Sequence, residues 1–187
     1  DHIGMPLRDG LSFVHSSLVG AGLRDRIKIG ASGKIITAFD IARAMALGAD
    51  WCNAARGFMF AVGCIQAQTC HTGKCPTGVT SQNPARSRAI VVSDKAARVA
   101  NFHQETVHTL AELVAAAGLK HPGEIQPHHF MRRAAPDRVI SFAEMYRTLH
   151  PGELISGTDQ PQFRQAWAMA QAESFAPRAV PVSAAAE

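Results

Sequence analysis

Three of the four cysteines of the chain lie close together, in residues 63–82. Cys64, Cys70 and Cys75 are separated by five and then four residues, in a polar segment that contains glycine and proline. A loop of this kind lets three thiolates converge on one inorganic cluster, and a cysteine followed by proline, as in Cys75-Pro76, is typical of ferredoxin-like ligand runs. The spacing favours an iron–sulfur cluster held by three cysteines.

Two other interpretations of the same cysteines stay open at this point. Zinc in a structural site takes four ligands, commonly in pairs two to four residues apart, and only His71 is near enough to be the fourth. The three cysteines could also be ordinary free thiols. Cys52 lies in the apolar segment 51–55, where a free cysteine is expected to fill the core.

A second chemical feature is a pair of turns that follow two predicted strands. These turns are Ser32-Gly33 and Ala55-Arg56-Gly57. In parallel α/β folds, ligands lie at the carboxyl ends of the strands, where loop N–H groups bind phosphate. Gly33 permits a close approach of an oxyanion, Ser32 can donate its hydroxyl, and Arg56 can add a charged contact. The turns therefore indicate a candidate phosphate site.

The elements that would position these residues follow a strand–helix order. Apolar periodicity predicts a helix from Leu11 to about Val19, and a strand at 26–31. A helix over 37–47 begins at Thr37, which has Asp40 three residues on, and a second strand covers 51–55. Two βα units in tandem indicate an α/β fold with a parallel sheet, open or closed into a barrel. The cysteine loop is expected directly after the second strand.

The second half of the chain is predicted to be mainly helical. After a linker to about Val92, the longest helix covers 94–117, with one apolar face and Gly118 as its cap. Shorter helices are expected at 128–133 and 142–149, and the chain from about Gly157 lacks a clear period. We therefore divide the chain into 1–92, a helical extension at 93–150 and an irregular tail at 151–187, whose last 10 residues are expected to be disordered.

Composition and motifs exclude several classes of protein. The net charge of +4 is spread along the sequence without a basic run, which argues against a nucleic-acid partner. No apolar segment of about 18 residues and no signal peptide occurs, so we expect a cytoplasmic protein without a membrane partner. Hydrolase, P-loop and Rossmann motifs are absent from the sequence.

None of the histidines has the spacing of a metal or catalytic site. His103 and His108 are five positions apart on a predicted helix and therefore point in different directions. His128 and His129 are expected to be solvated or capping side chains, and His15 to be a core or boundary residue. No histidine is assigned a catalytic role.

Taken together, these segments resemble the C-terminal part of the flavin-binding domain of the glutamate synthase family. The resemblance covers about the first 135 residues. It is carried by DHIGMP at 1–6, SGK at 32–34, the segment 37–50, and the cysteine loop with its trailing PTGVTSQNP at 76–84. The cysteine loop is the most specific of these motifs.

The resemblance implies a (β/α)8 barrel that binds FMN, with a [3Fe-4S] cluster held by Cys64, Cys70 and Cys75. It places Ser32, Gly33 and Lys34 in the loop after the seventh barrel strand. It also places Ala54, Ala55 and Arg56 where the loop after the eighth strand approaches the FMN phosphate. Many relatives have Gly-rich residues where this chain has residues 53–56, so the contacts to FMN there differ. The implied activity is the reduction of 2-iminoglutarate, formed from 2-oxoglutarate and ammonia, to L-glutamate.

A complete barrel needs about 250 residues, whereas this chain supplies two clear βα units. We therefore expect a fragment or one piece of a split protein, whose partners include the remainder of the barrel or an oligomer partner. An electron donor protein or an NAD(P)H-linked subunit is also expected. The alternatives are an electron-transfer or cofactor-anchoring module without catalysis, and a structural zinc or thiol domain.

Overall fold

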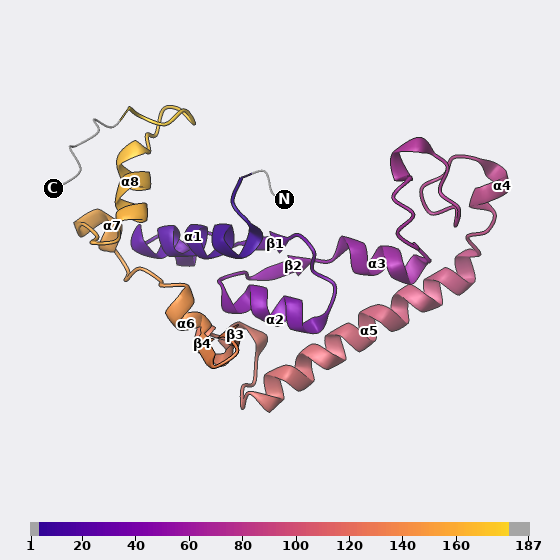
Figure 1. The fold of residues 1–187 in the computed structure, drawn as a ribbon, viewed down its shortest axis with the longest axis horizontal. Coiled ribbons are helices and arrows are strands. Elements are labelled where there is room, and N and C mark those ends of the chain that lie inside the picture. Colours follow the sequence, from indigo (N-terminus) through magenta and orange to yellow (C-terminus); the bar gives the residue numbers. More distant parts are fainter. Residues whose placement is uncertain (1–3, 180–187) are drawn as a thin grey trace.

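The structure is a computed structural model that describes residues 4–179 (Figure 1). The helices and strands in chain order are α1 (Leu7–Gly20), η1 (Arg24–Arg26), β1 (Gly30–Ser32), α2 (Ala38–Ala46), β2 (Trp51–Asn53), α3 (Ala55–Val62), η2 (Cys70–Thr72), α4 (Pro84–Ser87), α5 (Val92–Ala116), η3 (Pro122–Glu124), η4 (Pro127–His129), β3 (Met131–Ala135), β4 (Arg138–Ser141), α6 (Phe142–Met145), α7 (Glu153–Ser156) and α8 (Pro161–Met169).

The centre of the fold is a βαβ unit made of β1, α2 and β2. The two strands are parallel, and Ser32 lies opposite Asn53 in the register. Helix α2 begins with the predicted capping box, in which the Thr37 hydroxyl accepts from the Asp40 amide at 3.2 Å and the Asp40 carboxylate accepts from the Thr37 amide at 3.0 Å. The mixed α/β class is confirmed, while the completed barrel stays a prediction.

Both strands are shorter than predicted, for identifiable reasons. The prediction of a strand at 26–31 is wrong at its start, because η1 covers Arg24–Arg26 and the Ile29 amide bonds to the Asp50 carboxylate at 2.7 Å. The second strand stops at Asn53 because α3 begins at Ala55. The two paired strands are therefore short, and before β1 the hydrogen bond between Ile29 and the Asp50 side chain takes the place of strand pairing.

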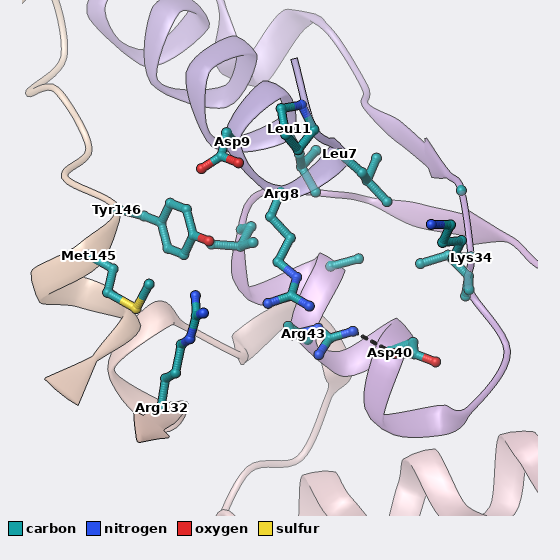
Figure 2. Close-up of a pocket in the computed structure, with 15 residues that line it drawn as sticks. Leu7, Arg8, Asp9, Leu11, Lys34, Asp40, Arg43, Arg132, Met145 and Tyr146 are labelled. Carbon is teal, nitrogen blue, oxygen red and sulfur yellow. Dashed lines mark hydrogen bonds and ion pairs between the residues drawn. The ribbon is translucent and has the colours of Figure 1, made fainter. Parts of the chain in front are cut away.

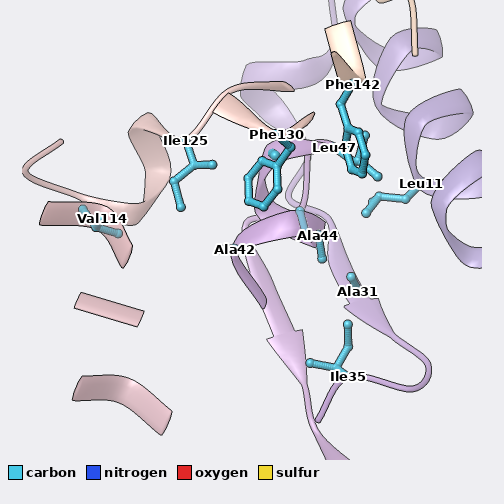
Figure 3. Packing of buried hydrophobic residues seen from close by; sticks show 12 residues of the cluster. Leu11, Ala31, Ile35, Ala42, Ala44, Leu47, Val114, Ile125, Phe130 and Phe142 are labelled. Carbon is cyan, nitrogen blue, oxygen red and sulfur yellow. The ribbon is translucent and has the colours of Figure 1, made fainter. Parts of the chain in front are cut away.

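A single apolar cluster joins the βαβ unit to the C-terminal segments (Figure 3). Ala31 of β1 and Ala42 of α2 are each 2% exposed, and small side chains here let the elements approach closely. Phe130 packs edge-on against Phe39 with ring centroids 5.3 Å apart, and Phe142 stacks on Phe130 at 5.7 Å. This aromatic group fastens the β3–β4 region to α2.

Helix α5 is the longest helix in the described residues, as predicted, and Gly118 follows its end at φ +74°. It packs against α2 and α3. Phe102 contacts Phe58 of α3 edge-on at 5.2 Å, and Val114 is buried in the apolar cluster. The long apolar face of α5 therefore supports the helix that leads into the cysteine loop.

The prediction of a helix at 128–133 is wrong. A 3₁₀ turn ends at His129, and β3 then pairs with β4 as an antiparallel hairpin, with Arg132 opposite Ile140. Pro136-Asp137 forms the turn, and the β-branched Val139 and Ile140 favour a strand. The segment 93–150 is thus only partly helical. The helix expected at 142–149 is the single turn α6, which the Ser141 side chain caps.

The tail is more ordered than predicted. Pro161 occupies the first turn of α8, where its missing N–H costs nothing. The ring of Phe163 stacks on Phe13 of α1 with centroids 4.9 Å apart, which anchors α8 to the N-terminal helix. The disorder expected for the last 10 residues concerns residues that lie almost wholly outside those described.

Candidate cluster and flavin site

The two turns predicted to bind phosphate leave the same edge of the sheet, because β1 and β2 are parallel neighbours. Gly33 has φ +139° and Lys34 has φ +54°, so the loop after β1 turns sharply at its start. Lys34 is exposed, and its backbone has the left-handed conformation, which is uncommon in residues other than glycine. The structure therefore brings Ser32, Gly33 and Lys34 next to the end of β2.

The segment after β2 is the start of a helix, so its prediction as a turn is wrong. Ala54 is the N-cap of α3, and its side chain cannot cap the helix. The first N–H groups of α3 consequently have no side-chain acceptor, which leaves them available to an anion. Arg56 is exposed beside them, in the first turn of the helix.

Helix α3 also corrects the expected position of the cysteine loop, which does not follow β2 directly. Gly57 is buried, and it has to be glycine because a Cβ atom there would lie 2.7 Å from the Phe102 ring of α5. Gly63 ends α3 at φ +115°, and the Cys64 amide donates to the Met59 carbonyl at 2.9 Å. The helix end therefore fixes the backbone at Cys64.

The three cysteines of the loop line one small hollow. Met59, Val79 and Thr80 line it with them, whereas His71 does not. Cys75 is buried, Cys64 is half-buried and Cys70 is exposed. Within residues 4–179 no three His, Cys, Asp or Glu side chains approach closely enough to hold a metal ion. The hollow thus gathers the predicted ligands without closing on a single point.

The chemistry of Cys75 differs from that of Cys52. Hydrogen bonds from the Thr77 side chain and then the Thr80 backbone lower the pKa of the Cys75 thiol to about 6. Burial raises the pKa of the Cys52 thiol to about 11. The thiolate is the metal-binding form, so Cys75 is suited to bind metal, whereas Cys52, half-buried against the apolar cluster, stays protonated.

A buried hydroxyl in the hollow adds to this picture. Thr80 Oγ1 is buried, has no further hydrogen-bond partner within the described residues, and lies beside the Cys75 thiol, whose pKa it helps to lower. A sulfide or thiolate sulfur in the hollow could accept its proton. Three sulfurs with one hydroxyl beside them fit a sulfur-rich group better than a zinc site, which needs a fourth ligand that His71 does not supply here.

Side-chain to backbone bonds hold the loop from its C-terminal side. The Ser81 hydroxyl donates to the Gly73 carbonyl at 2.7 Å, and the Arg86 guanidinium donates to the Lys74 carbonyl at 3.1 Å. Sequence reasoning missed Thr80 and Arg86. The signal for Arg86 was Asn83-Pro84, a helix start that was interpreted as a linker, because Asn83 caps the short helix that carries Arg86.

Comparison with known proteins bears on these segments directly. A family model described as the conserved region in glutamate synthase matches residues 1–120.

This chain belongs to the glutamate synthase family.

Individual relatives in the family agree with this match. The chain is 42% identical over 141 residues to the glutamate synthase large subunit-like protein YerD of Bacillus subtilis, covering 75% of this chain and 27% of YerD. It is 37% identical over 119 residues to the archaeal glutamate synthase (NADPH) of Methanocaldococcus jannaschii, covering 64% of this chain and 23% of that protein. The ferredoxin-dependent glutamate synthase of Pyropia yezoensis is 37% identical over 120 residues, which are 8% of its length. The chain thus spans about a quarter of the first two relatives.

No histidine of residues 4–179 lines the cysteine hollow, although His71 lies in the same loop. His15 accepts from the Arg24 guanidinium at 3.0 Å, and burial followed by the charge of Arg24 lowers its pKa. His108 pairs with Glu112 on the surface of α5, and His129 caps the turn at Gln126.

No helix in the described residues has the length and apolar character needed to cross a bilayer.

Proposed function

We propose that this chain is part of a glutamate synthase-type oxidoreductase that converts 2-oxoglutarate and ammonia, through 2-iminoglutarate, to L-glutamate with FMN and a [3Fe-4S] cluster. The observation that carries the proposal is the hollow lined by three cysteines, with the buried Thr80 hydroxyl beside Cys75, in a chain of this family. When bound, the two cofactors supply electron transfer and hydride transfer. The residues of this chain bind and orient them.

Cys64, Cys70 and Cys75 would hold the cluster. Three sulfurs match a three-iron cluster, and a fourth protein ligand is not needed. Cys75 is buried with its pKa near 6, so it supplies a thiolate at neutral pH, and the Thr80 hydroxyl can donate to a sulfur. Closing of the exposed Cys70 onto the hollow would complete the site.

The adjoining sheet edge would hold the FMN phosphate. Ser32 and Gly33 offer a hydroxyl and a backbone amide, and Lys34 adds a positive charge. The uncapped N-terminus of α3, at Ala54 and Ala55, offers further N–H groups, and Arg56 stands beside it. Amides and a helix dipole aimed at one place favour an anion without needing buried charge.

The partners follow from what the fold leaves uncovered. Within the described residues the sheet has only two strands, and Ile27 and Trp51 beside it are 42% and 49% exposed. We propose that the remainder of a barrel, or an oligomer partner, covers this edge. The electron donor is either a donor protein or an NAD(P)H-linked subunit, and the protein acts in the cytoplasm without nucleic-acid or membrane partners.

Anaerobic purification tests the cluster. Iron and acid-labile sulfide in a ratio of 3:4, with the EPR signal of an oxidised three-iron cluster, are expected. Changing any of Cys64, Cys70 or Cys75 to Ser should remove the iron, whereas Cys52→Ser should retain it. Zinc without iron would select the structural-domain alternative instead.

Flavin and activity are measured separately. Reconstitution with FMN should give a stoichiometric flavin spectrum, and Arg56→Gln should weaken FMN binding while iron is retained. Glutamate formation is then measured in the protein as isolated from its source. Flavin and iron at full occupancy with no glutamate formed would favour the cofactor-anchoring module.

A further inference from the structure

A pocket of about 460 Å³ lies between α1, the loop after β1, α2, β3 and α6, separate from the cysteine hollow (Figure 2). Four cationic side chains line it, namely Arg8, Lys34, Arg43 and Arg132. They come from four different segments of the chain. The tertiary fold, rather than a local motif, creates this concentration of charge.

Two of these side chains approach each other in the pocket, and a third faces the same space. Figure 2 shows the guanidinium groups of Arg8 and Arg43 approaching each other, with Arg132 extending toward them from the hairpin. Burial, and after it the positive charge of Arg8, lowers the pKa of Arg43. Arg8 and Arg43 therefore repel each other in the absence of an anion.

The carboxylates of the pocket do not neutralise this charge. Asp9 and Asp40 are the two that line it, against four cations. Asp40 is already bonded to Ile36, Thr37 and Arg43. Asp9 is exposed and forms no ion pair within residues 4–179, and neither Arg8 nor Arg132 forms an ion pair or donates a side-chain hydrogen bond there.

The surroundings are suited to a small ligand. Tyr146 extends its hydroxyl toward Arg8 in Figure 2 and forms no side-chain hydrogen bond within the described residues. Leu11, which is 6% exposed, and Met145 give the pocket an apolar side. Guanidinium groups donate in a planar fork that matches the oxygens of phosphates and carboxylates.

We propose that this pocket binds a small oxyanion, a phosphate or a dicarboxylate, through Arg8 and Arg132 with the Tyr146 hydroxyl as a further donor. Arg43 contributes charge while it remains bonded to Asp40. The site goes beyond the proposed function, because it uses neither the cysteines nor Arg56. Gly33 and Lys34 line this pocket and also belong to the candidate flavin site.

Calorimetric titration of the chain in phosphate-free buffer at low salt tests the site, with inorganic phosphate and succinate as separate probes. Binding of either probe is expected, and the stronger of the two identifies the ligand as phosphate-like or dicarboxylate-like. Arg8→Gln and Arg132→Gln should each weaken binding about tenfold, the effect of losing one charge-assisted contact. Arg98→Gln on the exposed face of α5 is the matched control and should bind like the unchanged chain.

Because both arginines have exposed side-chain surface and replacement by Gln leaves the core intact, far-UV circular dichroism should show that the variants fold. The proposal is overturned if neither probe binds the unchanged chain. It is also overturned if the double variant Arg8→Gln/Arg132→Gln binds the probes as tightly as the unchanged chain. It is also overturned if FMN displaces the phosphate while both arginine variants still bind it, since the anion would then occupy the flavin site. Added salt should weaken true binding by screening.

Discussion

The βαβ unit and the cysteine loop, residues 63–82, are neighbours in the chain but are stabilised by different interactions. The βαβ unit is held by apolar burial, in which Ala31 and Ala42 are each 2% exposed, and by the capping box of α2. Figure 1 shows the loop projecting with α4 at one end of the molecule, away from this core. Of its residues, only Cys75, Gly78 and Ser81 are buried.

Backbone strain accentuates the contrast. Gln66 and Gln68 have φ of +58° and +56°, and such conformations cost of order 1 kcal/mol each in a residue with a side chain. In the loop, hydrogen bonds such as the one from the Ser81 hydroxyl to the Gly73 carbonyl offset this cost. In the core, side-chain packing supplies the stabilisation instead. The βαβ unit is therefore stabilised mainly by packing, and the loop mainly by hydrogen bonds between its side chains and its backbone.

The largest effect is expected from Gly48→Ala in the core. A methyl group there would overlap the His15 ring, and Gly48 has φ +107°. We expect the free energy of unfolding to fall by about 3 kcal/mol, from overpacking and strain together. Urea denaturation measures it. Gly118→Ala is the control, because its φ is +74° but no atom lies within 4 Å, so it should cost only about 1 kcal/mol. Equal losses in the two variants would show that packing at His15 is unimportant.

Removing the cluster metal should affect the loop and leave the core unchanged. With iron bound, protease cleavage within residues 63–82 is expected to be at least about tenfold slower than after chelation, because a ligand bound only to the ordered loop suppresses local opening. Limited proteolysis with mass spectrometry measures the rate. Cleavage elsewhere in the described residues serves as the internal control. If chelation accelerates cleavage throughout the chain, the two regions are not independent.

The capping box of α2 should have a smaller effect. Thr37→Ala removes the hydroxyl that accepts from the Asp40 amide and should lower the free energy of unfolding by about 1 kcal/mol. Thr109→Ala, at an exposed position in α5, is the matched control and should be neutral or slightly stabilising. Thermal unfolding of both variants measures the difference. If Thr37→Ala does not lower the free energy of unfolding, the capping box does not contribute to the stability of the core.

The smallest effect concerns pH and His15. Burial and then the charge of Arg24 lower its pKa below the ordinary 6.5, while the charge of Asp50 opposes the shift. The unfolded chain therefore binds more protons in this range, so stability is complete above pH 6.5 and falls as the pH drops through 6.5 toward the folded pKa. The loss should be below about 1 kcal/mol, since His15 is only partly shielded from solvent.

Unfolding of the unchanged chain at pH 7.5 and pH 5.5 measures this dependence, with His15→Gln and His103→Gln compared. His15→Gln should flatten the profile, and His103→Gln, on the exposed face of α5, should not. An unchanged slope in His15→Gln would assign the pH dependence to other groups.

Much of the site could be predicted from the sequence, because it depends on local patterns. The spacing of Cys64, Cys70 and Cys75, the Thr37 cap and the long apolar face of α5 are signals contained within short segments, and the structure bears out the cap and the helix. The match of the family model to residues 1–120 confirms the resemblance. The roles of the cysteines and of Ser32, Gly33, Lys34 and Arg56 remain predictions.

Tertiary structure alone decided the rest. The contact between Phe130 and Phe39, residues far apart in the chain, fixes the position of the 131–141 hairpin on α2, whereas its turn and strands have local signals. No local pattern places Arg8, Arg43 and Arg132 in one pocket, since helix and strand periodicity act over a few residues. The sequence by itself thus determined the family and the main helices, and the role of its three clustered cysteines as ligands stays a prediction. Packing of distant segments determined which charges meet, because only long-range burial brings them together.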